Sequence, residues 1–235
     1  MIDTQTFPHL HLLVSGGNSQ LILLQSWQNW EIVGQTLDDA AGECFDKCGR
    51  SLGLPYPAGV YLSRIARLNN TNYCNLPISM LGQKQADNSQ SNLNYSFSGL
   101  KTAVRYLAQK QTIPDFEFEK SLSEAEIQEL TDFGLQPNFD FQKLSPKLRF
   151  IYDVCCSVQS VIIKQLLNKI QLAITIHKPH SIGLSGGVSA NQLLRQELQK
   201  TAAQNQIVKV LIPPLALSGD NAVMIALAGL AENYK

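Results

Sequence analysis

The C-terminal part of the sequence changes its hydrophobic period repeatedly, and this feature limits the possible folds most. An apolar stretch at 181–184 predicts a strand, the Ser-Gly-Gly sequence at 185–187 predicts a turn, and 189–202 follows helical spacing. A second strand at 207–212 and a helix at 220–233 are expected to follow. Because strands alternate with helices here, the sequence indicates an α/β architecture.

The front of the chain predicts a hairpin. Apolar residues at 9–14 and 19–25 are typical of two strands, and a Ser-Gly-Gly-Asn turn at 15–18 joins them. Two glycines after a strand allow a backbone to approach a ligand closely, and the hydroxyl of Ser15 adds a donor. A plain turn with positive φ explains the same residues and is favoured when this segment is taken alone.

A helix is expected at 38–52, with Asp38 or Asp39 as its N-cap and a glycine as its stop. The spacing of Asp39, Glu43 and Asp46 places three carboxylates on one face of this helix. Such a face needs solvent, a cation or a ligand rich in donors. A solvated acidic face is the commoner explanation.

The middle of the chain is predicted to be mainly helical. The expected elements are helices at 60–68, 99–109 and 147–176, a strand at 95–98 and a loop at 69–94. The stretch 111–146 combines mixed charges and prolines with a capping box from Ser123 to Glu126. We interpret it as an inserted, partly helical surface element.

Two turns could hold ligands. The glycine-rich turn before 189–202 meets a helix N-terminus, which is a natural anion site, and Asn191 could bond a sugar or phosphate. The alternative is a tight connection with Ser189 as the helix cap. At the last helix, Asp220 is either an N-cap or a metal ligand. A single carboxylate cannot hold a divalent ion alone.

Composition restricts the function classes. Lys+Arg and Asp+Glu both number 19, so RNA binding would need a local basic patch or a partner. The sequence has no run of 18 apolar residues, which argues against a membrane span. Five cysteines without framework spacing favour a reduced, cytosol-like compartment. His9 and His11 share one strand face but are too few for a closed metal site, and Cys44 and Cys48 fit a core stripe.

Six ordered blocks of sequence resemble one family. The first two read Leu-Leu-Val-Ser-Gly-Gly-Asn-Ser-Gln-Leu and Asp-Asp-Ala-Ala-Gly-Glu-Cys-Phe-Asp-Lys. The six blocks lie at 12–21, 38–47, 52–59, 95–102, 186–191 and 219–226. They are similar to the motifs of the TsaD family, also called Gcp and formerly described as O-sialoglycoprotein endopeptidase. No match is seen at 69–94 or within 111–146.

The resemblance implies an actin-like ATPase (ASKHA) fold, of which 7–235 would be mainly the C-terminal lobe, with the N-terminal lobe missing. It implies transfer of the threonylcarbamoyl group from threonylcarbamoyl-AMP to N6 of adenosine 37 in tRNAs reading ANN codons. It assigns no catalytic residue. By motif match, the adenylate would be held by Leu13, Val14, Ser15, Gly16, Gly17, Asp46, Gly59 and Asn191. Asp220 would be a ligand of one divalent metal, Fe²⁺ or Zn²⁺.

The same resemblance implies a cytoplasmic location and two partners, a TsaB-type paralogue and a TsaE-type ATPase. The family's His-x-x-x-His metal motif lies in the segment that precedes the start of this chain, so the expected metal site is incomplete. An alternative is an inactive fragment or a scaffold that keeps the nucleotide pocket. A metalloprotease is disfavoured because the sequence contains no His-Glu-x-x-His motif. A sugar or acyl kinase fits the blocks less well.

Overall fold

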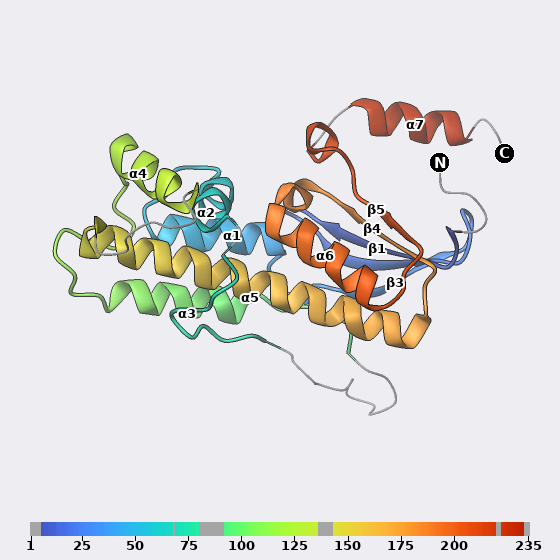
Figure 1. Ribbon diagram of the computed structural model, residues 1–235, viewed down its shortest axis with the longest axis horizontal. Helices are drawn as coiled ribbons and strands as arrows, with labels where there is room; N and C mark the ends of the chain where they lie inside the picture. Colours follow the sequence, from blue (N-terminus) through green and yellow to red (C-terminus); the bar gives the residue numbers. More distant parts are fainter. Residues whose placement is uncertain (1–5, 68, 80–91, 136–142, 220–221, 233–235) are drawn as a thin grey trace.

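One half of the molecule is built around a five-stranded sheet (Figure 1). The computed structural model describes residues 6–67, 69–79, 92–135, 143–219 and 222–232. The strands are β1 (His9–Val14), β2 (Ser19–Leu24), β3 (Trp30–Gln35), β4 (Ser181–Ser185) and β5 (Lys209–Leu211). Their spatial order is β3-β2-β1-β4-β5.

The sheet is mixed. The pairs β1–β2 and β2–β3 are antiparallel, whereas β1–β4 and β4–β5 are parallel. Leu13 pairs with Ser185, so the carboxyl ends of β1 and β4 meet at one edge of the sheet. Ligands of α/β proteins bind at such edges. The two Ser-Gly-Gly sequences therefore lie side by side although about 170 residues separate them in the chain.

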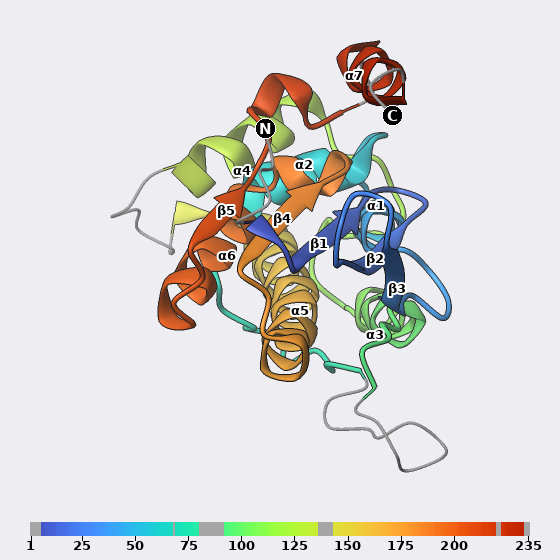
Figure 2. The same ribbon diagram turned by 90° about the vertical axis from the view of Figure 1, so that its right-hand side faces the viewer.

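Helices make up the rest. They are α1 (Ala41–Ser51), α2 (Ala58–Ala66), α3 (Ser98–Gln109), α4 (Glu124–Leu135), α5 (Pro146–His177), α6 (Gln192–Gln204) and α7 (Ala222–Glu232), with short 3₁₀ turns at Gly187–Ala190 and Leu215–Leu217. Figure 1 shows α1 to α4 gathered at one end of the molecule and the sheet at the other, with α5 running along both and α3 on its far side from α1 and α2. Figure 2 looks along α5 and shows it below β1 and β4, with α6 on one side and α3 on the other. This arrangement confirms the predicted α/β class.

The core lies between the sheet and α5. The side chains of Leu10, Leu12 and Val14 alternate along β1 toward the helices and are buried. Helix α5 is long and apolar enough to cross a membrane, but 78% of its most apolar stretch is buried inside the protein. Core packing therefore accounts for its composition.

Four of the five strands of the sheet were predicted. Strands β1, β2, β4 and β5 were expected, and β5 is shorter than predicted. Strand β3 was missed, because Gly34 is its only fully buried residue and no alternation marks it. The strand predicted at 95–98 is wrong. Tyr95 makes one isolated bridge with Thr36, and α3 begins at Ser98.

Two predicted helix caps are wrong. Helix α1 begins at Ala41 after Ala40, and no side chain caps it at that position. The hydroxyl of Ser19 accepts from the N–H of Ala41 instead, at 2.8 Å. Helix α6 begins at Gln192 rather than at 189, because a 3₁₀ turn intervenes and Asn191 is the N-cap. The predicted stop at Gly53 is confirmed, since that glycine has φ +82°.

Asp38 stabilises the start of another helix. Its carboxylate accepts from the hydroxyls of Ser96 (2.6 Å) and Ser98 (2.7 Å) and from the N–H groups of Phe97 (2.8 Å) and Ser98 (3.3 Å). Burial works against the charged form of Asp38, but these hydrogen bonds outweigh it and lower the pKa of the group. Asp38 thus ties the segment before α1 to the N-terminus of α3.

Replacing Asp38 with alanine is expected to destabilise the protein by about 2 kcal/mol, because α3 loses its first-turn acceptor. Asp38→Asn keeps one acceptor oxygen and should cost about half as much. Urea unfolding of both variants measures the difference. Equal midpoints for the alanine variant and the unaltered protein would contradict this role.

The predicted inserted element is partly helical, as expected. Ser123 and Glu126 form the reciprocal bonds of a capping box, 2.8 Å from the Ser123 N–H to the carboxylate and 3.3 Å from the Glu126 N–H to the hydroxyl. Helix α4 follows and packs on α2 and α5. The bounds of the insertion stay a prediction. Of the loop expected at 69–94, the described residues contain no helix or strand, and 80–91 lie outside them.

Candidate functional site

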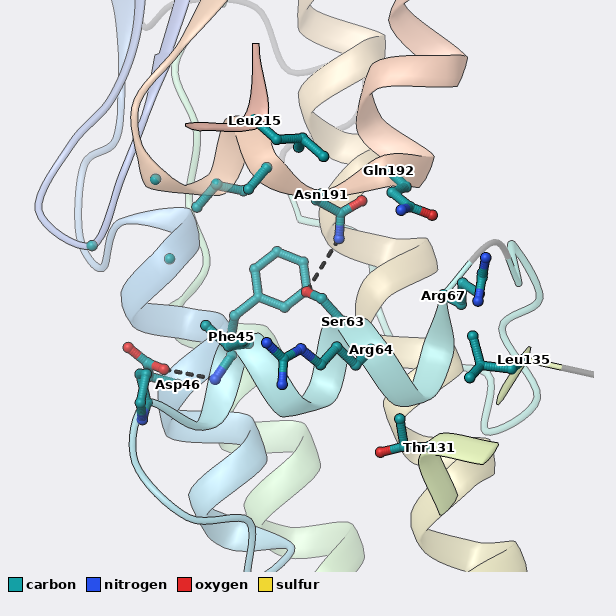
Figure 3. Close-up of a pocket in the computed structure, with 18 residues that line it drawn as sticks. Phe45, Asp46, Ser63, Arg64, Arg67, Thr131, Leu135, Asn191, Gln192 and Leu215 are labelled. Atoms are coloured by element: carbon teal, nitrogen blue, oxygen red, sulfur yellow. Dashed lines mark hydrogen bonds between the residues drawn. The ribbon is translucent and has the colours of Figure 1, made fainter. Parts of the chain in front are cut away.

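A cavity of about 780 Å³ lies beside the carboxyl ends of β1 and β4. Its walls come from the two Ser-Gly-Gly sequences, the first turns of α1, helix α2 and the C-terminal half of α4 (Figure 3). Among the predicted site residues, it is lined by Gly16, Asp46, Gly59 and Asn191. Its size lies within the range typical of small-molecule sites.

Close backbone packing brings these walls together. A Cβ added at Gly42 would lie 2.6 Å from the carbonyl oxygen of Ser15, and one at Gly59 would lie 2.9 Å from the Cβ of Phe45. The N–H of Gly42 donates to that same Ser15 carbonyl at 3.1 Å. Glycine is therefore needed at both positions for α1 to approach the β1–β2 turn and for α2 to approach α1.

Asp46 faces the cavity with one oxygen held in place. Its Oδ1 accepts from the N–H of Gly59 at 2.7 Å, which joins α1 to the first turn of α2. Figure 3 shows this bond and the carboxylate at the cavity wall. The other carboxylate oxygen has no partner among the described residues. It is available to accept from a hydroxyl of a ligand.

Asn191 is placed at the cavity but uses its amide within the protein. Its Oδ1 accepts from the N–H of Leu194 at 3.0 Å, and its Nδ2 donates to Ser63 Oγ at 3.2 Å and Gln159 Oε1 at 2.7 Å. The residue is only 7% exposed. Asn191 thus fixes the start of α6 against α2 and α5, and its predicted contact with a ligand stays a prediction.

The other predicted ligand residues do not line the cavity. Leu13 is half-buried in β1, and the side chain of Val14 belongs to the core. The hydroxyl of Ser15 accepts from the N–H groups of Gly17 (3.3 Å) and Asn18 (3.0 Å), so it closes the turn. The positive φ expected there is wrong. Within the described chain, Gly53 and Gly186 are the glycines with positive φ.

Several cavity residues were not predicted. Arg64 and Arg67 lie on α2 and at its end, and neither makes an ion pair with a described carboxylate. Figure 3 shows the guanidinium of Arg67 near Leu135 of α4, whereas that of Arg64 extends toward Phe45 and Asp46. The arginines have no sequence signal beyond their three-residue spacing. The α4 residues fall in the segment interpreted only as a surface element.

The predicted acidic face of α1 is not a single surface. Asp39 precedes the helix and pairs with the ammonium groups of Lys47 (3.1 Å) and Lys101 (2.6 Å). Burial opposes ionisation of Asp39, but the two lysines outweigh it and lower its pKa. Asp46 faces the cavity, whereas Glu43 pairs with Lys47.

Within the described chain, no group of three or more His, Cys, Asp or Glu side chains is arranged to hold a metal ion. Asp220, the predicted ligand, lies outside the described residues. Cys44 and Cys48 are buried with their sulfur atoms 3.9 Å apart, and the prediction that they pack in the core is confirmed. The donors in the described part of the chain therefore do not form a metal site by themselves.

His9 and His11 belong to a chain of hydrogen bonds across β1 and β4. The Thr6 carbonyl can only accept, so the hydroxyl of Ser181 donates to it at 2.7 Å and must accept from His9 Nδ1 at 2.6 Å. His9 Nε2 then accepts from His11 Nδ1 at 3.2 Å. His11 Nε2 accepts from the hydroxyl of Ser185 at 2.7 Å. Because both imidazoles are neutral near pH 7, with pKa values lowered to about 4, the Thr6 carbonyl thus fixes both as Nδ1–H tautomers.

Comparisons with known proteins agree with the sequence blocks. The family model TsaD, tRNA N6-adenosine threonylcarbamoyltransferase, matches residues 1–227. Proteins of that name from Bartonella bacilliformis and Chromobacterium violaceum are 37% and 38% identical to this chain, each over 95% of it. One from Bacillus subtilis is 35% identical over 97%.

The alignments cover 54%, 55% and 55% of those three proteins, so the chain spans about half the length of the curated relatives it matches. This agrees with the expectation that the chain is shorter than whole members. The match to the family model covers nearly all of the chain, including both Ser-Gly-Gly sequences and the α1 helix. The chain therefore belongs to the TsaD family of tRNA N6-adenosine threonylcarbamoyltransferases.

Proposed function

We propose that this chain forms the adenylate-binding part of an enzyme that transfers threonylcarbamoyl from threonylcarbamoyl-AMP to N6 of adenosine 37 in tRNAs reading ANN codons. The observation that carries the proposal is the cavity where Gly16, Asp46, Gly59 and Asn191 converge from four separate family motifs. The relatives are named for threonylcarbamoyl transfer to N6-adenosine of tRNA, and the adenylate donor and position 37 come from the family resemblance.

The cavity residues have chemistry suited to an adenylate. The second oxygen of Asp46 can accept a ribose hydroxyl, and the glycines at 16 and 187 let backbone N–H groups approach a phosphate. Threonylcarbamoyl-AMP carries a phosphate and a carboxylate, both anionic. Arg64 and Arg67 offer the cavity two guanidinium groups that no described carboxylate neutralises.

The divalent metal, Fe²⁺ or Zn²⁺, and Asp220 as its ligand remain proposals that rest on the family resemblance. The described residues do not provide the remaining ligands. The TsaB-type and TsaE-type partners and the cytoplasmic location are proposals on the same ground.

A variant of Asp46 tests the adenylate site. Asp46→Asn keeps the bond to Gly59 through its amide oxygen but removes the charge and the second acceptor. We expect about tenfold weaker binding of AMP and of a non-hydrolysable threonylcarbamoyl-adenylate analogue, because a hydrogen bond to a charged group is lost. Isothermal titration calorimetry measures both.

Glu43→Gln is the matched control, because it removes one carboxylate from the same helix and Glu43 does not line the cavity. Its affinity should equal that of the unaltered chain. Unchanged binding in Asp46→Asn, or an equal loss in both variants, would refute the assignment of the cavity.

A second candidate is a scaffold that binds the adenylate without transferring it. The cavity itself is compatible with this alternative, because Gly16, Asp46, Gly59 and Asn191 suit adenylate binding whether or not transfer follows. A transfer assay separates the two, because a scaffold binds the adenylate but leaves tRNA unmodified.

A further inference from the structure

A second groove, of about 540 Å³, concentrates positive charge on a chain whose net charge is zero. It lies between α1 and α3 and is separate from the cavity described above. The cations that line it are Lys47 and Arg50 of α1 and Lys101 and Arg105 of α3. A neutral protein that handles RNA needs such a local patch, since phosphates supply most of the binding energy.

The packing of two helices creates the groove. Lys47 and Arg50 are three residues apart on α1, and Lys101 and Arg105 are four apart on α3, so each pair shares one helix face. The opposite faces of both helices are buried in the core. The thiol of Cys44 also donates to the carbonyl of Phe97 at 3.7 Å. The cations are therefore held on rigid elements rather than on loops.

The two arginines are the uncommitted charges. Lys47 pairs with Asp39 and Glu43, and Lys101 pairs with Asp39, so both lysines are partly neutralised. Arg50 and Arg105 make no ion pair with a described carboxylate, although Glu119 also lines the groove. Arg105 lies over the ring of Phe118, 5.9 Å from its centroid, which leaves its N–H groups free to bind an anion.

An exposed aromatic ring distinguishes this groove from a simple anion site. Tyr106 lines it and is 58% exposed, next to Arg105 on the same helix. Proteins that bind single-stranded RNA combine cations for the backbone with aromatic side chains on which bases stack. Lys47 also follows Asp46 directly, so the groove begins one residue from the wall of the adenylate cavity.

We propose that the α1–α3 groove binds an RNA strand, with Arg50 and Arg105 on its phosphates and Tyr106 stacked on a base. The inference rests on the proposed function, because an enzyme acting on adenosine 37 must hold the unpaired loop around that base. It adds a surface of this chain on which the RNA would lie.

The test measures binding of a fluorescent anticodon stem-loop RNA by anisotropy at several salt concentrations. The double variant Arg50→Gln/Arg105→Gln should weaken binding on the order of tenfold and reduce the salt slope by about 1.4, since each lost phosphate contact removes about 0.7. Tyr106→Ala should weaken binding about tenfold without changing the slope, and Tyr106→Phe should restore it.

Lys110→Gln is the control, because it removes one exposed cation just beyond α3 and outside the groove. Its salt slope should stay close to that of the unaltered chain. Circular dichroism melts of each variant confirm that it is folded. The proposal is overturned if the Arg50→Gln/Arg105→Gln variant has the same salt slope as Lys110→Gln. It is also overturned if the groove variants weaken binding of a duplex DNA of the same length as much as they weaken binding of the RNA.

Binding of the adenylate analogue, measured on the same variants, separates this inference from the proposed function. If the double variant keeps both adenylate and RNA affinity, the groove assignment fails while the adenylate site stands. If the RNA affinity depends on the groove but no variant binds adenylate, the RNA surface stands and the proposed function fails.

Discussion

Replacing Gly186 with alanine is expected to destabilise the protein by about 3 to 5 kcal/mol and to remove adenylate binding. Gly186 has φ +89°, a conformation that L side chains rarely adopt. A Cβ at this position would also overlap the carbonyl oxygen of Val14 at the end of β1. The positive φ would strain the backbone of an alanine, and the overlap with Val14 would push the ends of β1 and β4 apart.

The position explains why both stability and binding should respond. Gly186 joins β4 to the 3₁₀ turn that carries Gly187 and Val188 to the cavity wall. The carbonyl of Val14 is backbone, so no side-chain rotation can relieve the overlap. A shift of either loop changes the distance between the two Ser-Gly-Gly sequences, on which the cavity depends.

Gly187→Ala is the matched comparison. A Cβ added at Gly187 meets no atom within 4 Å, and its φ is not positive. It should therefore change stability by less than about 1 kcal/mol. Thermal melts and calorimetry with the adenylate analogue measure both variants, and Gly186→Ala should melt roughly 10 °C lower. Similar melting temperatures for the two alanine variants would contradict the packing described for these strands.

Lowering the pH from 6.5 to about 4.5 should also destabilise the protein strongly, through His9 and His11. Burial lowers the pKa of His9 to about 4, and burial together with the nearby His9 lowers that of His11 to about 4. His9 is 1% exposed, and both rings crowd Gly183, where a Cβ would lie 2.5 Å from His11 Nδ1. Water cannot easily solvate a proton added there.

The direction follows from the two pKa values. In the unfolded chain each imidazole gains a proton near pH 6.5, whereas in the folded chain it stays neutral until about pH 4. The unfolded state therefore binds more protons in this window, and stability rises with pH. The contribution of the two neutral imidazoles to the free energy of unfolding is complete above pH 6.5 and is lost as the pH falls toward 4. Its size is about 3 kcal/mol for one imidazole and on the order of 5 kcal/mol for both.

Urea unfolding at pH 7.0, 6.0, 5.0 and 4.5 measures this loss. The double variant His9→Phe/His11→Phe replaces both imidazoles with flat aromatic rings that do not titrate, and Ser181 can still donate to the Thr6 carbonyl. Its stability should be nearly constant over the same range. An equal pH response in the variant and the unaltered chain would show that other groups cause it.

The sequence predicted elements well where hydrophobic period and burial agree. Strand β1 alternates, with Leu10 and Leu12 in the core and His9 and His11 on the other face, and both the strand and the shared histidine face were expected. Strand β3 has no such alternation because it lies at the edge of the sheet with one buried residue. Its pairing with β2 is set by tertiary contacts that no local pattern records.

Helix starts were harder, because several polar residues compete for each cap. Ser189 and Asn191 both suit a cap, and only the 3₁₀ turn between them shows that Asn191 takes the role. Asp38 or Asp39 was expected to cap α1, but the carboxylate of Asp38 reaches α3, which begins 60 residues later in the chain. Such long-range bonds are not encoded in local propensity.

The candidate site came from the family motifs rather than from local chemistry. The motifs pointed to Gly16, Asp46, Gly59 and Asn191, and the structure brings these four residues to one cavity. The contributions of Arg64 and Thr131 could not be predicted, because α2 and α4 meet only through tertiary packing. The α1–α3 groove could not be predicted either, because it forms only when the two helices pack. Its positive charges are also balanced by acidic residues in the overall composition.

The most direct test of the central claim is transfer of radiolabelled threonylcarbamoyl from its adenylate to a tRNA that reads ANN codons. The assay contains this chain, the TsaB-type and TsaE-type partners and Fe²⁺ or Zn²⁺, with or without a polypeptide supplying the N-terminal half of a full-length relative. We expect label in the tRNA only when that half is present, and about tenfold less with Asp46→Asn. No label with either mixture, from a folded chain that still binds the adenylate, would contradict the enzyme and leave the scaffold.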